Sequence, residues 1–415
     1  MEIFNQLCLA LLSCICFKTF NMKFFVAQIE KFSRTVGHET EFDRISTVAF
    51  TLQRIFGQQV LDPEWTWKKY FIHQIANLIL FVYVFFGTME CLKTTDDSEL
   101  AAEACYTLIM VAIFPIKMLL FIENRFIFRK LYLSAKTTLI SVITSDSSVN
   151  IFDVFKTARK IVYALFLIVL IPISIYEMTT LWFYLQGKRP LLSRSTATLM
   201  PMTAPYYEFA WFLHSVFLFE VSSTIILDMW FVLLIYFLCM ANDSLAKILN
   251  VPPKAEGESS TSYARRLNEC LRNFYKIHVE QVEYMNSLSI MYKWLGFVPL
   301  CNAAMCTCLL LLLLSKEINW KFAPHMLPIF AEIFAYNWFG EQIKTKTKNL
   351  HHALINFDWT NMELKDKKNY YITVTYMKKE FGISTAVGND LSLITMTAVL
   401  KISYQAFTVL QTVAD

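Results

Sequence analysis

The feature that most constrains this chain is a series of apolar stretches, each about as long as a bilayer is thick. A helix needs about 20 mostly apolar residues to cross the ~30 Å hydrocarbon core, whereas a barrel strand needs only about ten alternating ones. Because lipid satisfies no backbone polar group, stretches of this length must be helices. We therefore predict an all-α membrane protein. Seven segments qualify: residues 70–91, 101–122, 161–185, 206–227 running on toward 240, 295–315, 322–343 and 390–413.

Composition agrees with lipid as the solvent. Hydrophobic residues make up 55% of the 415 residues and charged residues only 17%, against about 25% charged in average soluble domains. This balance excludes a disordered chain and disfavours a soluble enzyme. Basic residues are dispersed and the pI is about 8.4, so we expect no nucleic-acid partner.

Lys and Arg residues orient the seven helices. If the N-terminus is cytoplasmic, 27 of the 38 basic residues lie on the inner side and six on the outer side. Inner loops carry the excess of positive charge in membrane proteins, so we predict a cytoplasmic N-terminus and an extracellular C-terminus. Asn242, in the Asn-Asp-Ser acceptor pattern, then lies inside and needs no glycan. Cys91 and Cys105 lie near the outer face, where a disulfide between them stays open.

Three segments outside the membrane have distinct characters. Residues 7–17 are too short to span and lack a basic flank, which favours a cytosolic or interfacial segment over a cleaved signal peptide and leaves Met1 or Met22 as the start. The stretch toward 240 exceeds the bilayer thickness, so we interpret it as one tilted helix that projects from the membrane. Residues 251–262 form a flexible loop, and 263–294 a helix that leads into the fifth span.

Catalytic motifs are missing from the sequence. There is no phosphate-binding Gly loop, no nucleophile elbow and no pair of His residues at zinc-binding spacing. His351 and His352 are adjacent and diverge on a helix, which favours a solvated pair over a metal site. We expect no enzyme, no cofactor and no metal.

Ionisable side chains within a span are costly and are functional hypotheses by default. Glu177, Glu220, Asp228 and Lys401 are of this kind. For Glu220 and Asp228 a packing role, with hydrogen bonds to the Ser and Thr residues at 222–224, is the favoured interpretation. Glu177 lies nearer the outer end, where it can border a cavity.

Aromatic and Met side chains are dense in the outer halves of the second, third, fourth and sixth spans. Apolar walls with a few polar groups are what a small lipophilic ligand needs, although such stripes are more often ordinary helix packing. The candidate ligand-binding residues, grouped by helix face, are Tyr106, Met110 and Ile113; Ile175, Met178 and Trp182; Trp211, His214 and Phe217; and Phe330, Phe334 and Asn337.

The C-terminal third resembles the insect odorant receptor family. The order of four tags carries the resemblance: Y-N-W-F-G-E-Q-I from Tyr336, H-H-A-L-I-N-F-D-W at 351–359, K-D-K-K-N-Y-Y at 365–371 and L-K-I-S-Y-Q-A-F-T-V-L at 400–410. The match covers about 80 residues, while the front 300 agree only in number of spans, loop sizes and orientation.

The resemblance implies a ligand-tuning subunit, not the shared co-receptor, of a heterotetrameric, odorant-gated, non-selective cation channel. It implies a small volatile odorant and the co-receptor as partners, surrounding membrane lipid, and a place in the plasma membrane of olfactory sensory neurons. The seventh helix would line the pore, with its constriction at Val409 and with Gln405, Thr408 and Leu410 beside it. Cytosolic helix extensions would form an inter-subunit anchor. A ring of Lys401 side chains would repel cations, so we expect Lys401 to face a neighbouring helix or the headgroups.

The expected organisation is a cytoplasmic segment 1–69, six transmembrane helices with the ligand pocket over 70–343, anchor helices over 344–388, and the pore helix with a short tail over 389–415. A G-protein-coupled or gustatory-type receptor is the alternative. The first is opposed by the orientation and the absence of D-R-Y and N-P-x-x-Y, the second by the absence of the T-Y-(five apolar)-Q-F tag. A lipid-modifying enzyme is disfavoured because no acid–base pair is present.

Overall fold

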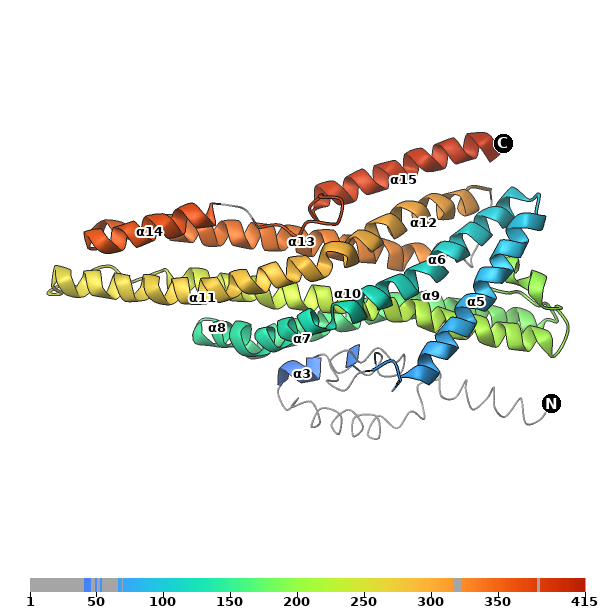
Figure 1. Ribbon diagram of the computed structural model, residues 1–415, viewed down its shortest axis with the longest axis horizontal. Helices are drawn as coiled ribbons and strands as arrows, with labels where there is room; N and C mark the ends of the chain where they lie inside the picture. Colours follow the sequence, from blue (N-terminus) through green and yellow to red (C-terminus); the bar gives the residue numbers. More distant parts are fainter. Residues whose placement is uncertain are drawn as a thin grey trace.

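The computed structural model describes residues 41–45, 49–50, 53, 66–68, 70–316, 322–378 and 381–414. These form an elongated bundle in which most of the long helices run near the long axis and α5 crosses it steeply (Figure 1). The long helices are α5 (Phe71–Thr94), α6 (Ser98–Glu123), α9 (Ile151–Leu185), α10 (Tyr206–Ile248), α11 (Ser260–Leu295), α12 (Phe297–Lys316), α13 (Met326–Ile355) and α15 (Leu393–Ala414). The shorter α-helices are α3 (Glu41–Ile45), α7 (Arg125–Ser134), α8 (Ile140–Ser145) and α14 (Leu364–Met377), and the single-turn helices are η1 (Ala135–Leu139), η2 (Arg194–Leu199), η3 (Ala323–His325) and η4 (Trp359–Asn361).

Each of the seven predicted spans coincides with a helix, and the all-α membrane fold is confirmed. Helix α10 is a single continuous helix of 43 residues, as expected for the stretch from 206. Six helical stretches in the described residues are long and apolar enough to cross a membrane, with α11 and α12 counted as one. Helix α13 is not among them, because Glu332, Asn337 and Glu341 make its first half more polar.

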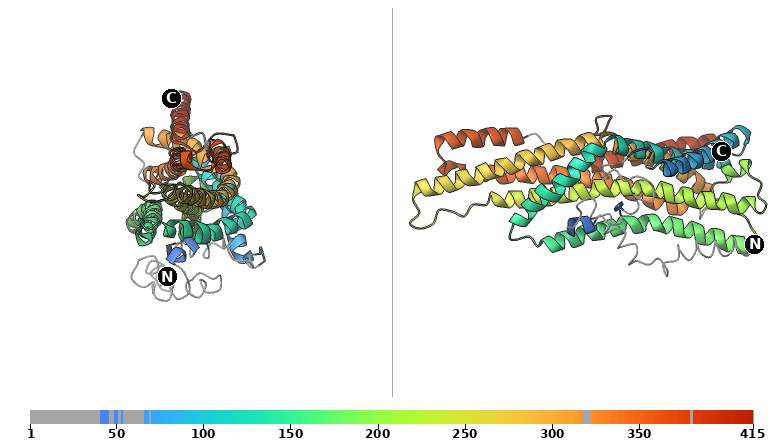
Figure 2. Two further views of the ribbon diagram at one scale, coloured as in Figure 1. Left: turned by 90° about the vertical axis from the view of Figure 1, so that its left-hand side faces the viewer. Right: turned by 60° about the horizontal axis from the view of Figure 1, so that its bottom comes forward.

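The bundle has two unlike ends. At one end, which we call the extended end, the last turns of α10 and α13, the start of α11, and α14 project beyond the other helices (Figure 1). At the opposite end, called the linker end, the 186–205 connection joins α9 to α10 and folds back over the bundle (Figure 2). The helix predicted over residues 263–294 corresponds to α11. The predicted loop from 251 covers the connection between α10 and α11 but ends earlier than expected, since α11 begins at Ser260.

Local signals in the sequence account for where several helices begin and end. The side chains of Asp97, Asn150 and Ser259 accept hydrogen bonds from backbone N–H groups in the first turns of α6, α9 and α11. Such caps satisfy donors that a helix start leaves open. Gly187 follows the end of α9 by two residues and has a φ of 78°, a conformation that glycine adopts without steric cost.

Helix α10 is the centre of the fold. Of its apolar stretch Leu227–Ile248, 78% is buried, whereas only 6% of the apolar stretch of α15 is buried. Trp230 on α10 packs against Phe50, Phe128 and Tyr132 with ring centroids 5.0, 5.1 and 5.7 Å away. This aromatic cluster ties α7 to α10, and most of the described core surrounds it.

Two predictions about the periphery can now be placed. Cys91 and Cys105 are both free thiols, so the disulfide that the sequence left open is not formed. The cytosolic or interfacial segment 7–17 and the alternative start at Met22 lie outside the described residues. The direction in which the bundle sits in the membrane stays a prediction.

Candidate functional site

The linker between α9 and α10 closes one end of the bundle through charged and polar contacts. Arg194 forms ion pairs with Glu99 and Glu103 of α6, at 3.0 and 2.9 Å. Helix η2 of this linker lies against α5, where the Cα atom of Thr196 would be 3.0 Å from a Cβ atom on Gly87. The linker therefore packs into the bundle instead of lying loosely over it.

The candidate residues on α6 face the interior. Tyr106 and Ile113 are buried, and Met110 is partly buried against the core. The hydroxyl of Tyr106 lies 3.0 Å from Nδ1 of His325, which is also buried. This hydrogen bond joins α6 to the start of α13. The sequence interpretation did not pair Tyr106 with His325.

The candidate residues on α10 also lie inside, near the linker end. Nε2 of His214 is 2.7 Å from the hydroxyl of Thr196 in η2. The indole nitrogen of Trp211 donates to Oε2 of Glu177 on α9, at 3.1 Å. The other carboxylate oxygen of Glu177 is buried without a hydrogen-bond partner in the described part of the chain. Phe217 is buried in the same apolar cluster as Val111 and Tyr176.

The candidate residues on α9 lie elsewhere. Met178 and Trp182 are 66% and 62% exposed on the outer surface of the bundle, and Ile175 is exposed beside them. The inward face of α9 at this level consists of Ile173, Tyr176 and Thr180 instead. Figure 2 shows α9 along the side of the bundle, where no other helix of the described residues covers its outer face. The structure does not bring these three predicted residues into the interior.

Of the three candidate residues on α13, two are exposed and one is buried. Phe330 and Phe334 are exposed, and Phe334 stacks on the exposed Trp338 with ring centroids 5.6 Å apart. Asn337 is fully buried, but its amide is already used within the protein. Its nitrogen donates to the carbonyl of Ile333 at 2.8 Å, and its oxygen accepts from the backbone N–H of Ser392 at 3.1 Å. Asn337 thus holds the start of α15 against α13.

The candidate gate residues lie on the helix that the bundle covers least. Val409 is 61% exposed, Leu410 and Gln405 are exposed, and Thr408 is partly buried. Helix α15 packs on α12 and α13 through a face that includes the buried Ser403, along one edge of the bundle (Figure 1). A polar stripe runs along the other side, formed by Thr397, Lys401, Gln405, Thr408 and Thr412.

A buried charged cluster in the middle of the bundle was missed by the sequence interpretation. The ammonium group of Lys117 on α6 contacts Asp228 of α10 at 2.9 Å and also Glu332 of α13. Tyr336 donates to Asp228 at 2.6 Å. The presence of Lys117 in an otherwise apolar span was the available signal, because a lysine there needs a carboxylate partner. Asp228, expected to bond to nearby Ser and Thr residues, bonds to this cluster instead.

A metal site finds no support in the described residues. No group of three or more His, Cys, Asp or Glu side chains there is arranged to hold a metal ion. His351 and His352 lie with ring centroids 6.2 Å apart near the end of α13.

Comparisons with known proteins identify the family. The family model of the 7tm odorant receptors matches residues 97–404 of this chain. Odorant receptor Or2 of Anopheles gambiae is 23% identical over 161 residues, 38% of this chain and 42% of that protein. Odorant receptor 10 of Aedes albopictus is 22% identical over 140 residues, 33% of this chain and 37% of that protein. These matched stretches span about two fifths of each relative.

Solved structures show the same fold. The insect olfactory receptor OR5 of Machilis hrabei superposes with a TM-score of 0.70 at 14% identity, over 88% of this chain and 96% of that one. Its complex with eugenol gives a TM-score of 0.68 at 12% identity, over 90% and 100%. Given the family match over most of its length, the chain belongs to the 7tm odorant receptor family, a family of receptors and not of enzymes.

Proposed function

We propose that this odorant receptor is the ligand-tuning subunit of a heterotetrameric cation channel that it forms with a shared co-receptor. The observation that carries the proposal is the polar stripe on α15, which points away from the bundle of its own chain. At 100° per residue the five polar residues lie within about 80° of one another, opposite the buried Ser403. A lone receptor would expose this stripe to lipid.

Lipid is a poor environment for that stripe. The threonine hydroxyls can bond to their own helix, as Thr408 does to the carbonyl of Gln405 at 2.8 Å. The amide of Gln405 cannot be satisfied in this way, and an amide left unpaired in hydrocarbon costs about 2–7 kcal/mol. A water-filled pore bordered by α15 from several subunits removes that cost. We therefore assign α15 to the pore.

The gate would then be formed by Val409, at the side of the stripe, while Leu410 follows it in the chain on the side of Ser403. A ring of valine side chains closes a narrow pore by excluding water, and small movements of the helices open it. The Lys401 side chain lies about 12 Å along the helix from Val409, since a helix rises 1.5 Å per residue. Its flexible stem lets the ammonium turn toward headgroups or a neighbouring subunit.

The odorant site would lie among α6, α9 and α10 near the linker end, on the predicted outer side. Tyr106, Met110, Trp211, His214 and Phe217 supply an apolar, aromatic interior there. The unpartnered Oε1 atom of Glu177 offers a hydrogen-bond acceptor to an odorant that carries a donor. The related OR5 has been solved with eugenol, a small volatile molecule of this general kind. An odorant opens the channel only by binding the open state more tightly than the closed one.

The excess of basic residues on one side supports a cytoplasmic N-terminus, and the extended end would then lie in the cytosol. The helices that project there would pack against other subunits as the anchor. A plasma membrane of olfactory sensory neurons is the setting in which such a channel acts, with lipid around its outer faces.

Recording currents in oocytes with and without the co-receptor, against an odorant panel, tests the proposal. We expect odorant-evoked cation currents only from the co-expressed pair. Val409→Ala should raise the current without odorant severalfold, whereas Val399→Ala, on the face toward α12, should leave it unchanged. Currents that require a G protein, or a Val409→Ala channel identical to wild type, would contradict the channel or the gate respectively.

A matched pair of tryptophans tests the odorant site. Trp211→Ala should change the rank order of odorants, because Trp211 lies inside and holds Glu177. Trp182→Ala should change it much less, because Trp182 is exposed. The reverse result would place the ligand on the outer face of α9.

A further inference from the structure

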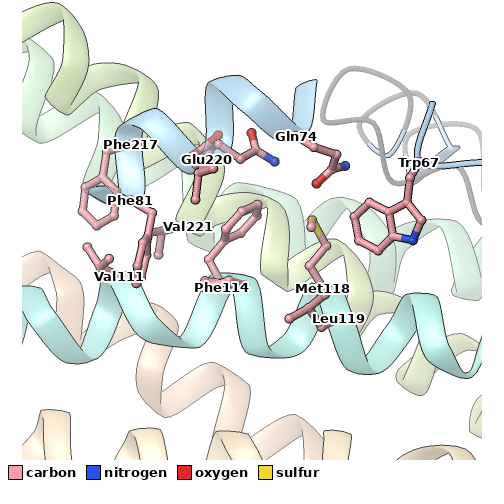
Figure 3. A pocket seen from close by; sticks show the side chains of 13 residues that line it. Trp67, Gln74, Phe81, Val111, Phe114, Met118, Leu119, Phe217, Glu220 and Val221 are labelled. Carbon is pink, nitrogen blue, oxygen red and sulfur yellow. The ribbon is translucent and has the colours of Figure 1, made fainter. Parts of the chain in front are cut away.

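A cavity lies among α5, α6 and α10 and meets the proposed odorant site only at Phe217 (Figure 3). It has a volume of about 330 Å³, and we call it the α5 cavity. Its walls come from the first half of α5 and the second half of α6, and therefore from the half of the bundle nearer the extended end. Of the twelve candidate ligand-binding residues, only Phe217 lines it.

The walls of the α5 cavity are mostly apolar and its mouth faces the membrane. Val111, Phe114 and Met118 line the α6 side (Figure 3). Leu78 and Leu119, which also line it, are 59% and 51% exposed on the outer surface of the described helices. A ligand dissolved in the bilayer can therefore reach the cavity sideways, without passing through the bundle.

One wall carries polar groups that an apolar occupant would not use. Glu220 lines the cavity and is only 6% exposed. The amide nitrogen of Asn77, in the orientation that its neighbours favour, donates to Glu220 and to the carbonyl of His73. Gln74 lies one helical turn before Asn77 on α5, and its Nε2 atom is buried without a hydrogen-bond partner in the described residues. Figure 3 shows Gln74 and Glu220 along the same side of the cavity.

A carboxylate acceptor and an amide donor along one wall select a particular functional group. A hydroxyl group donates its proton to Glu220 and accepts a hydrogen bond from Gln74 at the same oxygen. A protonated amine can donate but has no lone pair for Gln74, a carboxylate ligand is repelled by Glu220, and a hydrocarbon leaves the Gln74 amide without an acceptor. We propose that the α5 cavity binds a lipophilic alcohol, with its hydroxyl between Gln74 and Glu220 and its apolar body against α6.

The volume and the polar groups set what can be expected of such a site. Small-molecule pockets of about 300–1,000 Å³ are mostly apolar, with a few polar groups that fix the orientation of the ligand. A matched alkane lacks the hydrogen bond to Gln74 and leaves that buried amide unpaired, which weakens binding by about a power of ten. An alcohol should therefore bind at least about tenfold more tightly than the alkane of the same length.

Photolabelling of the full chain in cell membranes tests the proposal directly. The probe is a medium-chain primary alcohol that carries an alkyl diazirine, and labelled peptides are mapped after purification of the receptor. We expect saturable labelling of α5 and α6, with competition by the unlabelled alcohol and about tenfold weaker competition by the alkane and the amine. The readout is binding, so it does not depend on the channel proposal.

Variants then assign the labelling to the cavity. Glu220→Leu and Gln74→Leu should each weaken labelling about tenfold. Glu220→Gln should weaken labelling less, because an acceptor oxygen remains. Val111→Trp should fill the cavity and abolish labelling. Glu90→Leu makes the same change on the exposed surface of α5 and should have no effect. Gln74→Leu is half-buried near the start of its helix, so it tests the site even if a variant in the interior fails to fold.

Two outcomes would overturn the proposal: labelling that the alkane blocks as well as the alcohol, or labelling unchanged by both Glu220→Leu and Gln74→Leu. A sterol diazirine probe separates two sources of the hydroxyl. If the sterol labels the same peptides, the occupant is an alcohol of the membrane itself. If only the medium-chain alcohol labels them, the occupant is a volatile that partitions into the bilayer. Either source supports an alcohol site.

Discussion

At the scale of single residues, the charged cluster around Lys117 shows how this bundle buries charged side chains in a membrane, where lipid cannot solvate them. One ammonium group lies between carboxylates from two other helices, and the three side chains are nearly without exposure. Two carboxylates that face each other without the lysine would carry uncompensated charge in a medium of low dielectric. Breaking such a buried pair costs about 3–5 kcal/mol, although an apolar replacement of the whole cluster can be neutral.

We therefore expect Lys117→Met to remove most of the receptor from the cell surface and to lower its thermal stability in detergent. Lys93→Met is the control, because Lys93 is exposed and lies 3.7 Å from Glu90, a distance at which a surface pair contributes little. Combining Lys117→Met with Asp228→Asn and Glu332→Gln should recover part of the lost stability. Equal stability of the Lys117→Met and Lys93→Met variants would contradict the role of the cluster.

Gly340 on α13 is a second residue whose role follows from geometry. A Cβ atom built there would overlap the carbonyl oxygen of Leu391 and lie 2.7 Å from the Cβ atom of Leu391. Alanine is the better helix former by about 1 kcal/mol, so without this contact Gly340→Ala would stabilise α13. Because the neighbour is backbone and cannot turn away, we expect destabilisation by about 1–3 kcal/mol and altered gating. A rise in melting temperature for Gly340→Ala would refute the close approach.

At the scale of helices, the sequence predicted where the elements lie better than which way they face. Span lengths and basic loops were enough to locate seven helices, because the bilayer fixes both. The inward face of α9 was predicted from Ile175, Met178 and Trp182, but the structure turns Ile173, Tyr176 and Thr180 inward. Lipid tails are as apolar as the protein core, so hydrophobic periodicity does not distinguish an inner from an outer face in a membrane helix.

Polar contacts between helices were also beyond the sequence. Asn337 was assigned to a ligand site because it is a polar residue beside aromatic ones. In the structure its amide joins α13 to the first turn of α15, a partner more than fifty residues away in the chain. A single sequence contains no signal for such a pairing, because any buried asparagine needs partners and the fold decides which.

The loop after α13 offers a prediction about pH at this scale. Asp358 accepts hydrogen bonds from the Asn361 amide, from Tyr263 of α11 and from Thr360, each at 2.8 Å. These bonds, the one from Asn361 first, hold the pKa of Asp358 below its usual value despite some burial. A carboxyl whose pKa is lower in the folded state contributes stability above its unfolded pKa of about 3.9, and loses it as the pH falls through the folded pKa.

Hydrogen exchange in the first turns of α11 and α14, corrected for intrinsic rates, should therefore be constant from about pH 8 to pH 5 and should rise below about pH 4. Asp358→Asn should raise exchange at neutral pH and remove the dependence on acid. Asp366→Asn, in the first turn of α14, is the matched control for a change of charge. Exchange that rises between pH 7 and pH 5 would require another titrating group.

At the scale of the whole molecule, the uneven burial of the helices is the property that a single chain cannot account for. Helix α10 is enclosed by its neighbours, while α15 is held by one face at the edge of the bundle, with its polar stripe outward (Figure 1). If several chains enclose a water-filled pore, the stripe is in contact with water. If the chain is surrounded by lipid, the stripe is in contact with lipid. The two cases differ in whether a water-borne reagent reaches the stripe.

Cysteine accessibility on α15 decides between these cases. In cells that express this chain with the co-receptor, a positively charged methanethiosulfonate reagent should modify Gln405→Cys and Thr412→Cys while odorant is applied. The cation current should then fall, because the added positive charge lies in the pore. Ser403→Cys, on the face toward α12 and α13, should react much more slowly. Wild type supplies the background from the native thiols.

If Gln405→Cys is as unreactive as Ser403→Cys in both the resting and the odorant-bound channel, the stripe faces lipid and α15 does not line the pore. Faster modification of Gln405→Cys with odorant than without it would place Gln405 on the far side of the Val409 constriction from the reagent, since in an inverted bundle the outer solution reaches Val409 first.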